Sequence, residues 1–94
     1  MGVNGLNKIS FSTNTFFIGE ENNELAKITF VPTGENKIII DHTYVSEAAR
    51  GQGLGEQLVE RVVQYARENN KKIIPLCPFA KLQIGKNPKF SDVL

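Results

Sequence analysis

The sequence predicts an α+β domain in which one long amphipathic helix packs on a mixed, mostly antiparallel sheet. Segments with strand-like composition occupy the first half of the chain, and a segment with helical periodicity follows them. A short apolar run after the helix has the composition of a strand buried on both faces. The predicted order is therefore β-β-β-α-β-α, and the 94 residues are expected to form a single domain spanning residues 1–94.

Three strands are predicted before the helix. Residues 15–18 are mostly aromatic and β-branched, and residues 25–31 alternate between apolar and polar side chains. The loop PTGEN, residues 32–36, joins the second strand to a third strand, KIIIDHTYV, at residues 37–45. Residues 1–14 are rich in Asn, Ser and Thr, which predicts an arm with a short extended piece at residues 9–11.

The hydrophobic period changes after the third strand. Leu54, Leu58 and Val62 recur at helical spacing, which predicts a helix from about Gly53 to Glu68. An Asn-Asn pair ends this helix, and two lysines beyond it suit the negative end of the helix dipole.

The segment after the helix predicts a fourth strand. Its sequence, KIIPLC at residues 72–77, is nearly continuous in apolar side chains. A right-handed crossover through the helix would place this strand parallel to the third one. Pro78 ends the strand, and residues 79–85 are expected to form one or two helical turns.

The composition excludes several classes of protein. Eleven basic and ten acidic residues give a net charge of +1, which argues against an electrostatic nucleic-acid binder. No apolar run approaches the roughly 20 residues of a membrane span, and no signal-peptide core precedes the first strand. The single Cys77 cannot form an internal disulfide, which fits a reducing, cytoplasmic compartment. With one Cys and one His, no metal site is expected.

A glycine-rich stretch lies between the third strand and the helix. In SEAARGQGLGEQLVE, residues 46–60, small residues leave the first amides of the helix open to an anion such as phosphate. A Walker loop would need Lys and Ser or Thr after Gly55, where Glu56 and Gln57 stand instead. A dinucleotide fingerprint would place its third glycine at position 56, which is Glu56. Both familiar nucleotide loops are therefore excluded, while a plain tight turn stays the alternative.

The pattern Arg50-x-x-Gly53-x-Gly55 after a strand resembles the acyl-CoA pyrophosphate loop of the GNAT superfamily of N-acetyltransferases, [QR]-x-x-G-x-[GA]. The resemblance covers residues 37–77 in detail. The combination HTYV-x(4)-RGQGLG…PLCPF is similar to small GNAT-like proteins without the N-terminal, acceptor-binding helices of larger members. The resemblance implies a minimal GNAT-like fold and an acetyl-CoA-dependent transfer of an acetyl group to an amine. The amine acceptor, a small molecule or a protein, and the oligomeric state stay open.

The resemblance also implies which positions bind acetyl-CoA. The backbone from about Gln52 to Glu56 would face the pyrophosphate, Arg50 would organise the loop, and Phe79 would pack against the pantetheine arm. Arg50 as a plain surface charge and Phe79 as a core cap are the alternatives. The third strand would pair with pantetheine where it separates from the fourth. The full set is Thr43, Tyr44, Val45, Arg50, Gly51, Gln52, Gly53, Leu54, Gly55, Glu56 and Phe79.

His42 and Cys77 are the candidate catalytic residues. Acetyl transfer to an amine needs a base for the amine proton and an acid for the departing thiolate. His is the side chain that titrates near neutrality, and Cys can serve as acid or as acyl-carrying nucleophile. The alternatives are a structural, hydrogen-bonded His42 and a Cys77 that is a small core residue. Alternation along the third strand does not decide whether His42 faces the ligand or the helix.

One departure from the family pattern bears on catalysis. Many larger members carry a Tyr in the last helix that can protonate the CoA sulfur, whereas the corresponding segment here, AKLQIGKNPKF, contains none. This departure favours a role for Cys77. It also keeps open a second function, a non-catalytic module that binds CoA or acyl-CoA.

Overall fold

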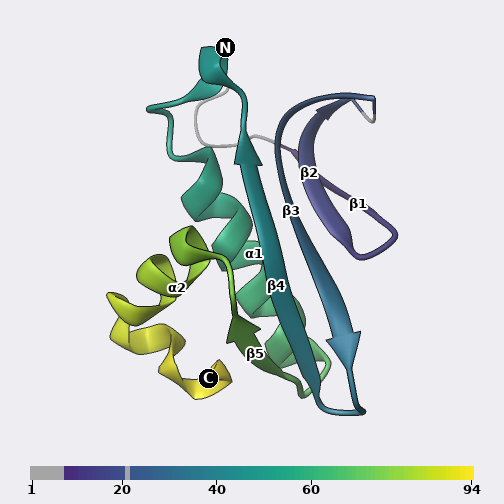
Figure 1. Ribbon diagram of the computed structural model, residues 1–94, viewed down its shortest axis with the longest axis vertical. Coiled ribbons are helices and arrows are strands. Elements are labelled where there is room, and N and C mark those ends of the chain that lie inside the picture. Colours follow the sequence, from purple (N-terminus) through teal and green to yellow (C-terminus); the bar gives the residue numbers. More distant parts are fainter. Residues whose placement is uncertain (1–7, 21) are drawn as a thin grey trace.

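The computed structural model describes residues 8–20 and 22–94 and contains a five-stranded sheet in the order β1-β2-β3-β4-β5 (Figure 1). The strands are β1 (Ile9–Ser12), β2 (Thr15–Glu20), β3 (Asn23–Thr33), β4 (Lys37–Val45) and β5 (Lys72–Pro75). Neighbouring strands from β1 to β4 are antiparallel, whereas β5 is parallel to β4. The parallel pair is joined by the helical crossover that the sequence predicts.

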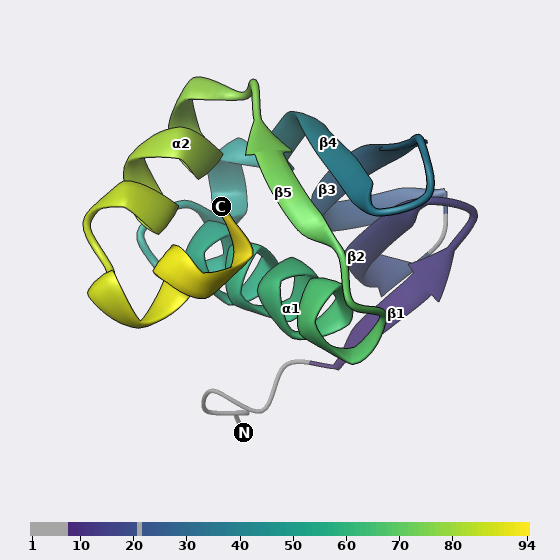
Figure 2. The same ribbon diagram turned by 90° about the horizontal axis from the view of Figure 1, so that it is seen from below.

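Two α-helices complete the fold: α1 (Leu54–Glu68) and α2 (Pro78–Gly85). Short 3-10 segments, η1 (Glu47–Ala49) and η2 (Pro88–Val93), precede α1 and end the chain. Helix α1 lies along one face of the curved sheet, and α2 with the C-terminal segment lies beside β5 (Figure 2). Among the described residues, no helix covers the opposite face of the sheet.

The core lies between α1 and the sheet. The helix buries its apolar stripe, as its period predicts, and residues such as Leu58 and Val62 have no exposed surface. From the sheet, Ile28 and Phe30 of β3 and Ile38 of β4 meet this stripe and are at most 1% exposed. Transfer of such side chains out of water is the main stabilising contribution of the layer.

The N-terminal arm and the end of the fourth predicted strand differ from expectation. Residues 9–12 form β1, which pairs with β2 from Ile9↔Ile18 to Ser12↔Thr15, so the sheet has one strand more than the predicted order. Residues 1–7 of the predicted arm lie outside the described residues. The last strand ends at Pro75 rather than Cys77, because the next two backbone N–H groups both donate to the same acceptor, the carbonyl of Ile40.

The third predicted strand contains a β-bulge. Phe30 pairs with Ile40 and Thr29 pairs with His42, which leaves Asp41 as the extra residue of β4. Before the bulge, Ile38 and Ile40 point into the core, and the side-chain alternation shifts by one after it.

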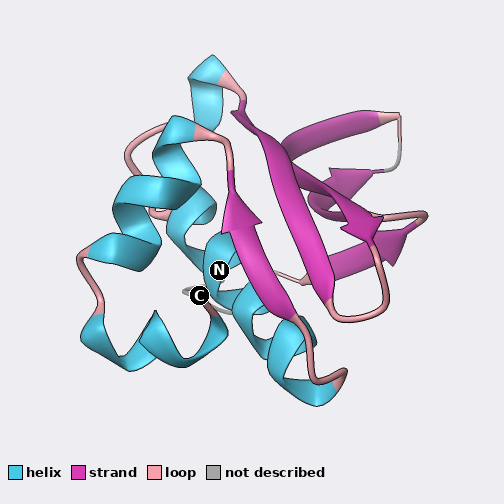
Figure 3. Cartoon of the chain, turned by 60° about the horizontal axis from the view of Figure 1, so that its bottom comes forward, coloured by secondary structure: helices cyan, strands magenta, loops and turns pink. Residues whose placement is uncertain are grey.

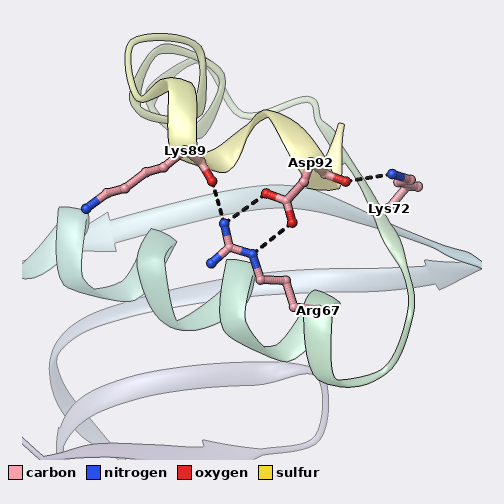
Figure 4. A network of polar contacts seen from close by, with 4 residues as sticks. All are labelled: Arg67, Lys72, Lys89 and Asp92. Atoms are coloured by element: carbon pink, nitrogen blue, oxygen red, sulfur yellow. Dashed lines mark hydrogen bonds and ion pairs between the residues drawn. The ribbon is translucent and has the colours of Figure 1, made fainter.

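An ion-pair network fastens the C-terminal segment to α1 and β5 (Figure 4). The guanidinium of Arg67 donates through Nε and Nη2 to the two carboxylate oxygens of Asp92 at 2.9 and 2.8 Å, and Nη2 also donates to the carbonyl of Lys89. Nζ of Lys72 donates to the carbonyl of Asp92 at 2.6 Å. Hydrogen bonding to Arg67 lowers the pKa of the Asp92 carboxyl below its ordinary value.

Within residues 8–20 and 22–94, no helix has the length and apolar character needed to cross a membrane.

Candidate functional site

The candidate site begins where β4 and β5 separate. Their pairing runs from Lys37↔Lys72 to Ile40↔Pro75 and then stops, because β5 turns away into α2. Strand β4 continues past the end of β5, paired only with β3 on its other side, as Figure 3 shows. Its unpaired edge, residues 41–45, therefore offers backbone groups to an extended ligand in the position of a missing strand.

The bulge decides which side chains of β4 face this opening. Thr43 contacts Cys77, and Val45 packs against the core, so both point toward the helical face. His42 and Tyr44 are exposed on the opposite face, where Tyr44 is 41% exposed. The question that the sequence left open is thereby answered: the imidazole lies on the face away from α1.

Cys77 lies at the opening and at the start of α2. It is the N-cap residue of the helix, Pro78 takes the first helical position, and the thiol is only 8% exposed. Sγ of Cys77 donates a hydrogen bond to Oγ1 of Thr43 at 3.4 Å, and this contact bridges the gap between β4 and α2. When the thiol is ionised, the Thr43 hydroxyl can donate to the sulfur instead. The Leu-Cys-Pro sequence thus forms a helix start rather than a strand end, since Pro is favoured at the first helical position.

The surroundings of Cys77 favour its thiolate. Burial raises the pKa of the thiol, but hydrogen bonds from the Thr43 hydroxyl and from the backbone N–H groups of Ala80, Phe79 and Thr43 lower it. The net pKa of Cys77 lies below its ordinary value. A helix N-terminus is a setting in which thiol pKa values fall, and such a thiol is a better nucleophile than an ordinary buried cysteine.

The loop before α1 adopts the backbone conformation that its glycines permit. Gly51 and Gly53 have φ of +84° and +75°, a region in which other residues are strained. The first intrahelical bond runs from the N–H of Gln57 to the carbonyl of Gly53 at 3.1 Å. The amides of residues 54–56 precede that bond, at the positive end of the helix dipole. Nε of Arg50 donates to the carbonyl of Val45 at 3.3 Å, which ties the loop to the end of β4.

Gly55 has a different role from the other two glycines. It lies inside α1, and a Cβ at this position would come 2.8 Å from Cζ and 2.9 Å from Cε2 of Phe79. Phe79 in turn packs against the hydrophobic core. The absence of a side chain at Gly55 therefore allows the ring of Phe79, in α2, to lie directly against the first turn of α1.

The remaining predicted binding residues differ in which part of each is available to a ligand. Leu54 is buried, at 2% exposure, so its side chain anchors the helix and only its amide is available to a ligand. Gln52, within the loop, and Glu56, in the first turn of α1, are exposed. Tyr44 points away from α1, which leaves its backbone as the part that lies along the open edge of β4.

The sequence predicts Thr43 on the pantetheine-binding edge but does not reveal its side-chain contact with Cys77. The contact depends on the bulge at Asp41, and no feature of the alternation in KIIIDHTYV marks an inserted residue. The polar Asp-His pair after three isoleucines is the one local signal of an interrupted strand.

A groove lies on the open face of the sheet, on the same side as His42. It encloses about 420 Å³ and is lined by Asn22, Asn23, Glu24, Lys27, His42 and Tyr44. Asp41, next to His42, accepts a hydrogen bond from Oγ1 of Thr29 at 2.6 Å. Within the described residues, no three His, Cys, Asp or Glu side chains gather as metal ligands.

The chain belongs to the GCN5-related N-acetyltransferase family. A family model described as GCN5-related N-acetyl-transferase matches residues 15–93. The NMR structure of a GCN5-like protein from Staphylococcus aureus has 47% identity and a TM-score of 0.80, over 95% of this chain and 88% of that chain. These matches confirm the predicted family and the mixed α+β fold.

More distant structures share the fold. A predicted acetyltransferase from Clostridium acetobutylicum, solved with acetyl-CoA, has 23% identity and a TM-score of 0.56, over 77% of this chain and 54% of that one. A protein from Mycobacterium tuberculosis in complex with CoA has 14% identity and a TM-score of 0.61, over 84% of this chain and 56% of that one. The chain spans just over half the length of these two proteins. The comparison with curated proteins gave no match.

Proposed function

We propose that the chain binds acetyl-CoA and transfers the acetyl group to an amine. The observation that carries this proposal is the separation of β4 from β5 directly beside Cys77, with the glycine loop at the far end of the same strand edge. Family membership and the acetyl-CoA and CoA of the two distant structures support the choice of donor.

In the proposed binding mode, the donor lies along the unpaired edge of β4. Backbone groups of residues 43–45 pair with the pantetheine amides as a neighbouring strand would. The amides of residues 52–56 face the pyrophosphate, where the helix dipole favours negative charge. Arg50 holds the loop by its bond to Val45 and adds a positive charge nearby. The ring of Phe79 contributes an apolar wall beside the pantetheine.

In the proposed chemistry, Cys77 is the nucleophile. Its thiolate attacks the thioester carbonyl; the Cys77 S–C bond forms, the C–S bond to CoA breaks, and the CoA thiolate takes a proton from solvent. An amine then attacks the acetyl-Cys77 carbon, the N–C bond forms, and the Cys77 thiolate leaves. His42 accepts the proton that the amine loses, from the open face of the sheet.

Calorimetry with acetyl-CoA and release of CoA thiol across a panel of amines test this function. We expect binding, and thiol release that depends on the amine. The variant Gly53→Ala should weaken acetyl-CoA binding about tenfold or more, the loss expected when a charge-assisted hydrogen bond is disturbed. Gly34→Ala is the matched control, because Gly34 also has a positive φ, +65°, and open space around it but lies in the β3–β4 turn.

Each result has a definite meaning. Equal acetyl-CoA binding by wild type, Gly53→Ala and Gly34→Ala would contradict the proposed binding of the pyrophosphate at the loop. A complete absence of acetyl-CoA binding by the folded wild-type protein would contradict the proposed function as a whole.

The second candidate function is a CoA-binding module without catalysis. The positions of the two tyrosines favour it, because neither lies in the last helix, where larger family members carry the Tyr that can protonate the CoA sulfur. Tyr65 packs in α1 with its ring centroid 5.1 Å from that of Phe30, and Tyr44 is exposed on the open face. Mass spectrometry after incubation with acetyl-CoA separates the two functions. An acetyl adduct that Cys77→Ala abolishes supports the enzyme, and binding without adduct or amine-dependent thiol release supports the module.

A further inference from the structure

The contact between Cys77 and Thr43 connects the start of α2 to β4, beyond the point where the β4–β5 pairing ends. Beyond Ile40 no residue of β5 pairs with β4, yet Oγ1 of Thr43 reaches across to Sγ of Cys77 at 3.4 Å. The sulfur is nearly buried, so its orientation is set by this contact and by the start of α2 rather than by solvent.

The bulge makes this contact possible. With regular alternation, Thr43 would lie on the face opposite to Ile40, and its hydroxyl would point away from α2. The extra residue Asp41 brings Thr43 to the same face as Ile40, which is fully buried. A distortion that weakens strand pairing therefore directs one hydroxyl group to the sulfur.

Charged groups on the elements around Cys77 do not contribute to the lowered pKa of its thiol. Asp41 and His42 of β4, Glu56 of α1 and Lys81 of α2 are exposed, and Asp41 is hydrogen-bonded to Thr29. The interactions that lower the pKa of Cys77 come from the Thr43 hydroxyl and from backbone N–H groups. Thr43 is thus the side chain whose replacement should affect the thiol most directly.

We propose that Thr43 is a positioning residue for acetyl transfer: its hydroxyl holds the Cys77 sulfur at the end of the β4–β5 pairing and donates a hydrogen bond to the thiolate that attacks the thioester. This inference rests on the proposed function, because it gives Thr43 a role in forming acetyl-Cys77. The hydroxyl transfers no proton in the step. It orients the sulfur lone pair that forms the new S–C bond, while the bond to CoA breaks and the CoA thiolate takes its proton from solvent.

Three substitutions at position 43 test the role. Thr43→Val keeps the shape and removes the hydroxyl, Thr43→Ser keeps the hydroxyl, and Thr43→Ala removes it with less bulk. Thr33→Val is the matched control, because Thr33 lies on neighbouring β3 at the far end of the hairpin, paired with Lys37. The first readout is the pH profile of Cys77 alkylation by iodoacetamide, which needs no acetyl-CoA. The second is the rate of acetyl-Cys77 formation, measured by mass spectrometry.

We expect Thr43→Val and Thr43→Ala to move the alkylation profile to higher pH. Acetyl-Cys77 formation at neutral pH should slow about three- to tenfold, as a loss of part of a hydrogen bond to a charged group implies, and recover as the pH rises. Thr43→Ser should restore both readouts toward wild type, and Thr33→Val should change neither. Should Thr43→Val fail to fold by circular dichroism, the comparison of Thr43→Ser with Thr43→Ala gives the same contrast.

The two readouts test the role of Thr43 and the role of Cys77 as the nucleophile separately. An unchanged alkylation profile in folded Thr43→Val and Thr43→Ala would overturn the role of Thr43. A shifted profile with no acetyl-Cys77 in any variant, wild type included, would contradict Cys77 as the nucleophile and with it the part of Thr43 in acetyl transfer. A shifted profile with slower acetylation that Thr43→Ser rescues supports both.

Discussion

At the scale of single residues, the three glycines of the loop serve two purposes. Gly51 and Gly53 supply positive φ, whereas Gly55 makes room for the ring of Phe79. The sequence shows the spacing of the glycines but not their different roles, because the residue that packs against Gly55, Phe79, lies more than twenty positions later in the chain. The spacing predicts the loop only together with the strand before it and the helix after it, and the partner of each glycine required the packed structure.

The contact between Gly55 and Phe79 predicts a coupled pair of substitutions. Gly55→Ala should destabilise the fold by about 1–3 kcal/mol, as overpacking does, because the ring must move from its place. Phe79→Leu should reduce that cost in the double variant. Urea denaturation of the two single variants and the double variant measures the coupling energy. Strictly additive effects would mean that the ring and the new methyl group do not meet.

The thiol of Cys77 predicts a pH dependence. Because its pKa in the folded protein is lowered, the thiolate persists to lower pH than in the unfolded chain. Its stabilising contribution is fully present above the unfolded pKa and is lost as the pH falls through the folded pKa. Iodoacetamide should therefore react with the native protein along a profile whose midpoint lies below that of the urea-unfolded protein. Coincident midpoints would contradict the favourable surroundings of the thiol.

At the scale of elements, the helix and the third predicted strand follow directly from the sequence. Strand β4 covers the predicted residues, and α1 begins one residue later than predicted, because Gly53 caps the helix. Strand β1 is less evident, since two of its four residues are serines and it depends on pairing with β2. The end of β5 depends on the Ile40 carbonyl, which accepts two N–H groups of a distant segment. Local patterns thus define the elements, and contacts between elements define where they separate.

The C-terminal network predicts how η2 responds to acid. Because Arg67 lowers the pKa of Asp92, the ion pair stabilises the folded state above the unfolded pKa of Asp92 and is lost as the pH falls through the folded pKa. Asp92→Asn should lower the melting temperature slightly at neutral pH, since the two side chains are 41% and 56% exposed. The difference should vanish in acid. Glu68→Gln, an exposed carboxylate on the same helix, is the control, and an equal effect of both variants at neutral pH would argue against the network.

At the scale of the whole molecule, the sheet separates the two halves of the proposed reaction. Cys77 and Thr43 lie on the face covered by helices, whereas His42 and the groove of about 420 Å³ lie on the open face. The unpaired edge of β4 lies in the plane between them. In the proposed reaction, the donor at this edge therefore meets the thiolate from the helical face, and the amine approaches the acetyl group on Cys77 from the open face.

This separation predicts that His42 affects only the second half-reaction. His42→Gln should form acetyl-Cys77 at the wild-type rate but release it to an amine about 10²–10⁴-fold more slowly, the usual contribution of general base catalysis. Rapid mixing with acetyl-CoA alone, followed by addition of amine, measures the two steps separately. Val31→Thr, an exposed position on β3 outside the groove, is the control. A slower first step in His42→Gln, or an unchanged second one, would contradict the assignment.

The ring of Phe79 against Gly55 also has a consequence for cooperativity. The two helix starts that would hold the thioester and the pyrophosphate of the donor share this apolar contact, so we expect a change at one to be felt at the other. A ligand that bridges them should protect backbone amides of both helices from hydrogen exchange together, well beyond the atoms it touches. Ligand binding would then be recorded as slower exchange across the entire helical layer.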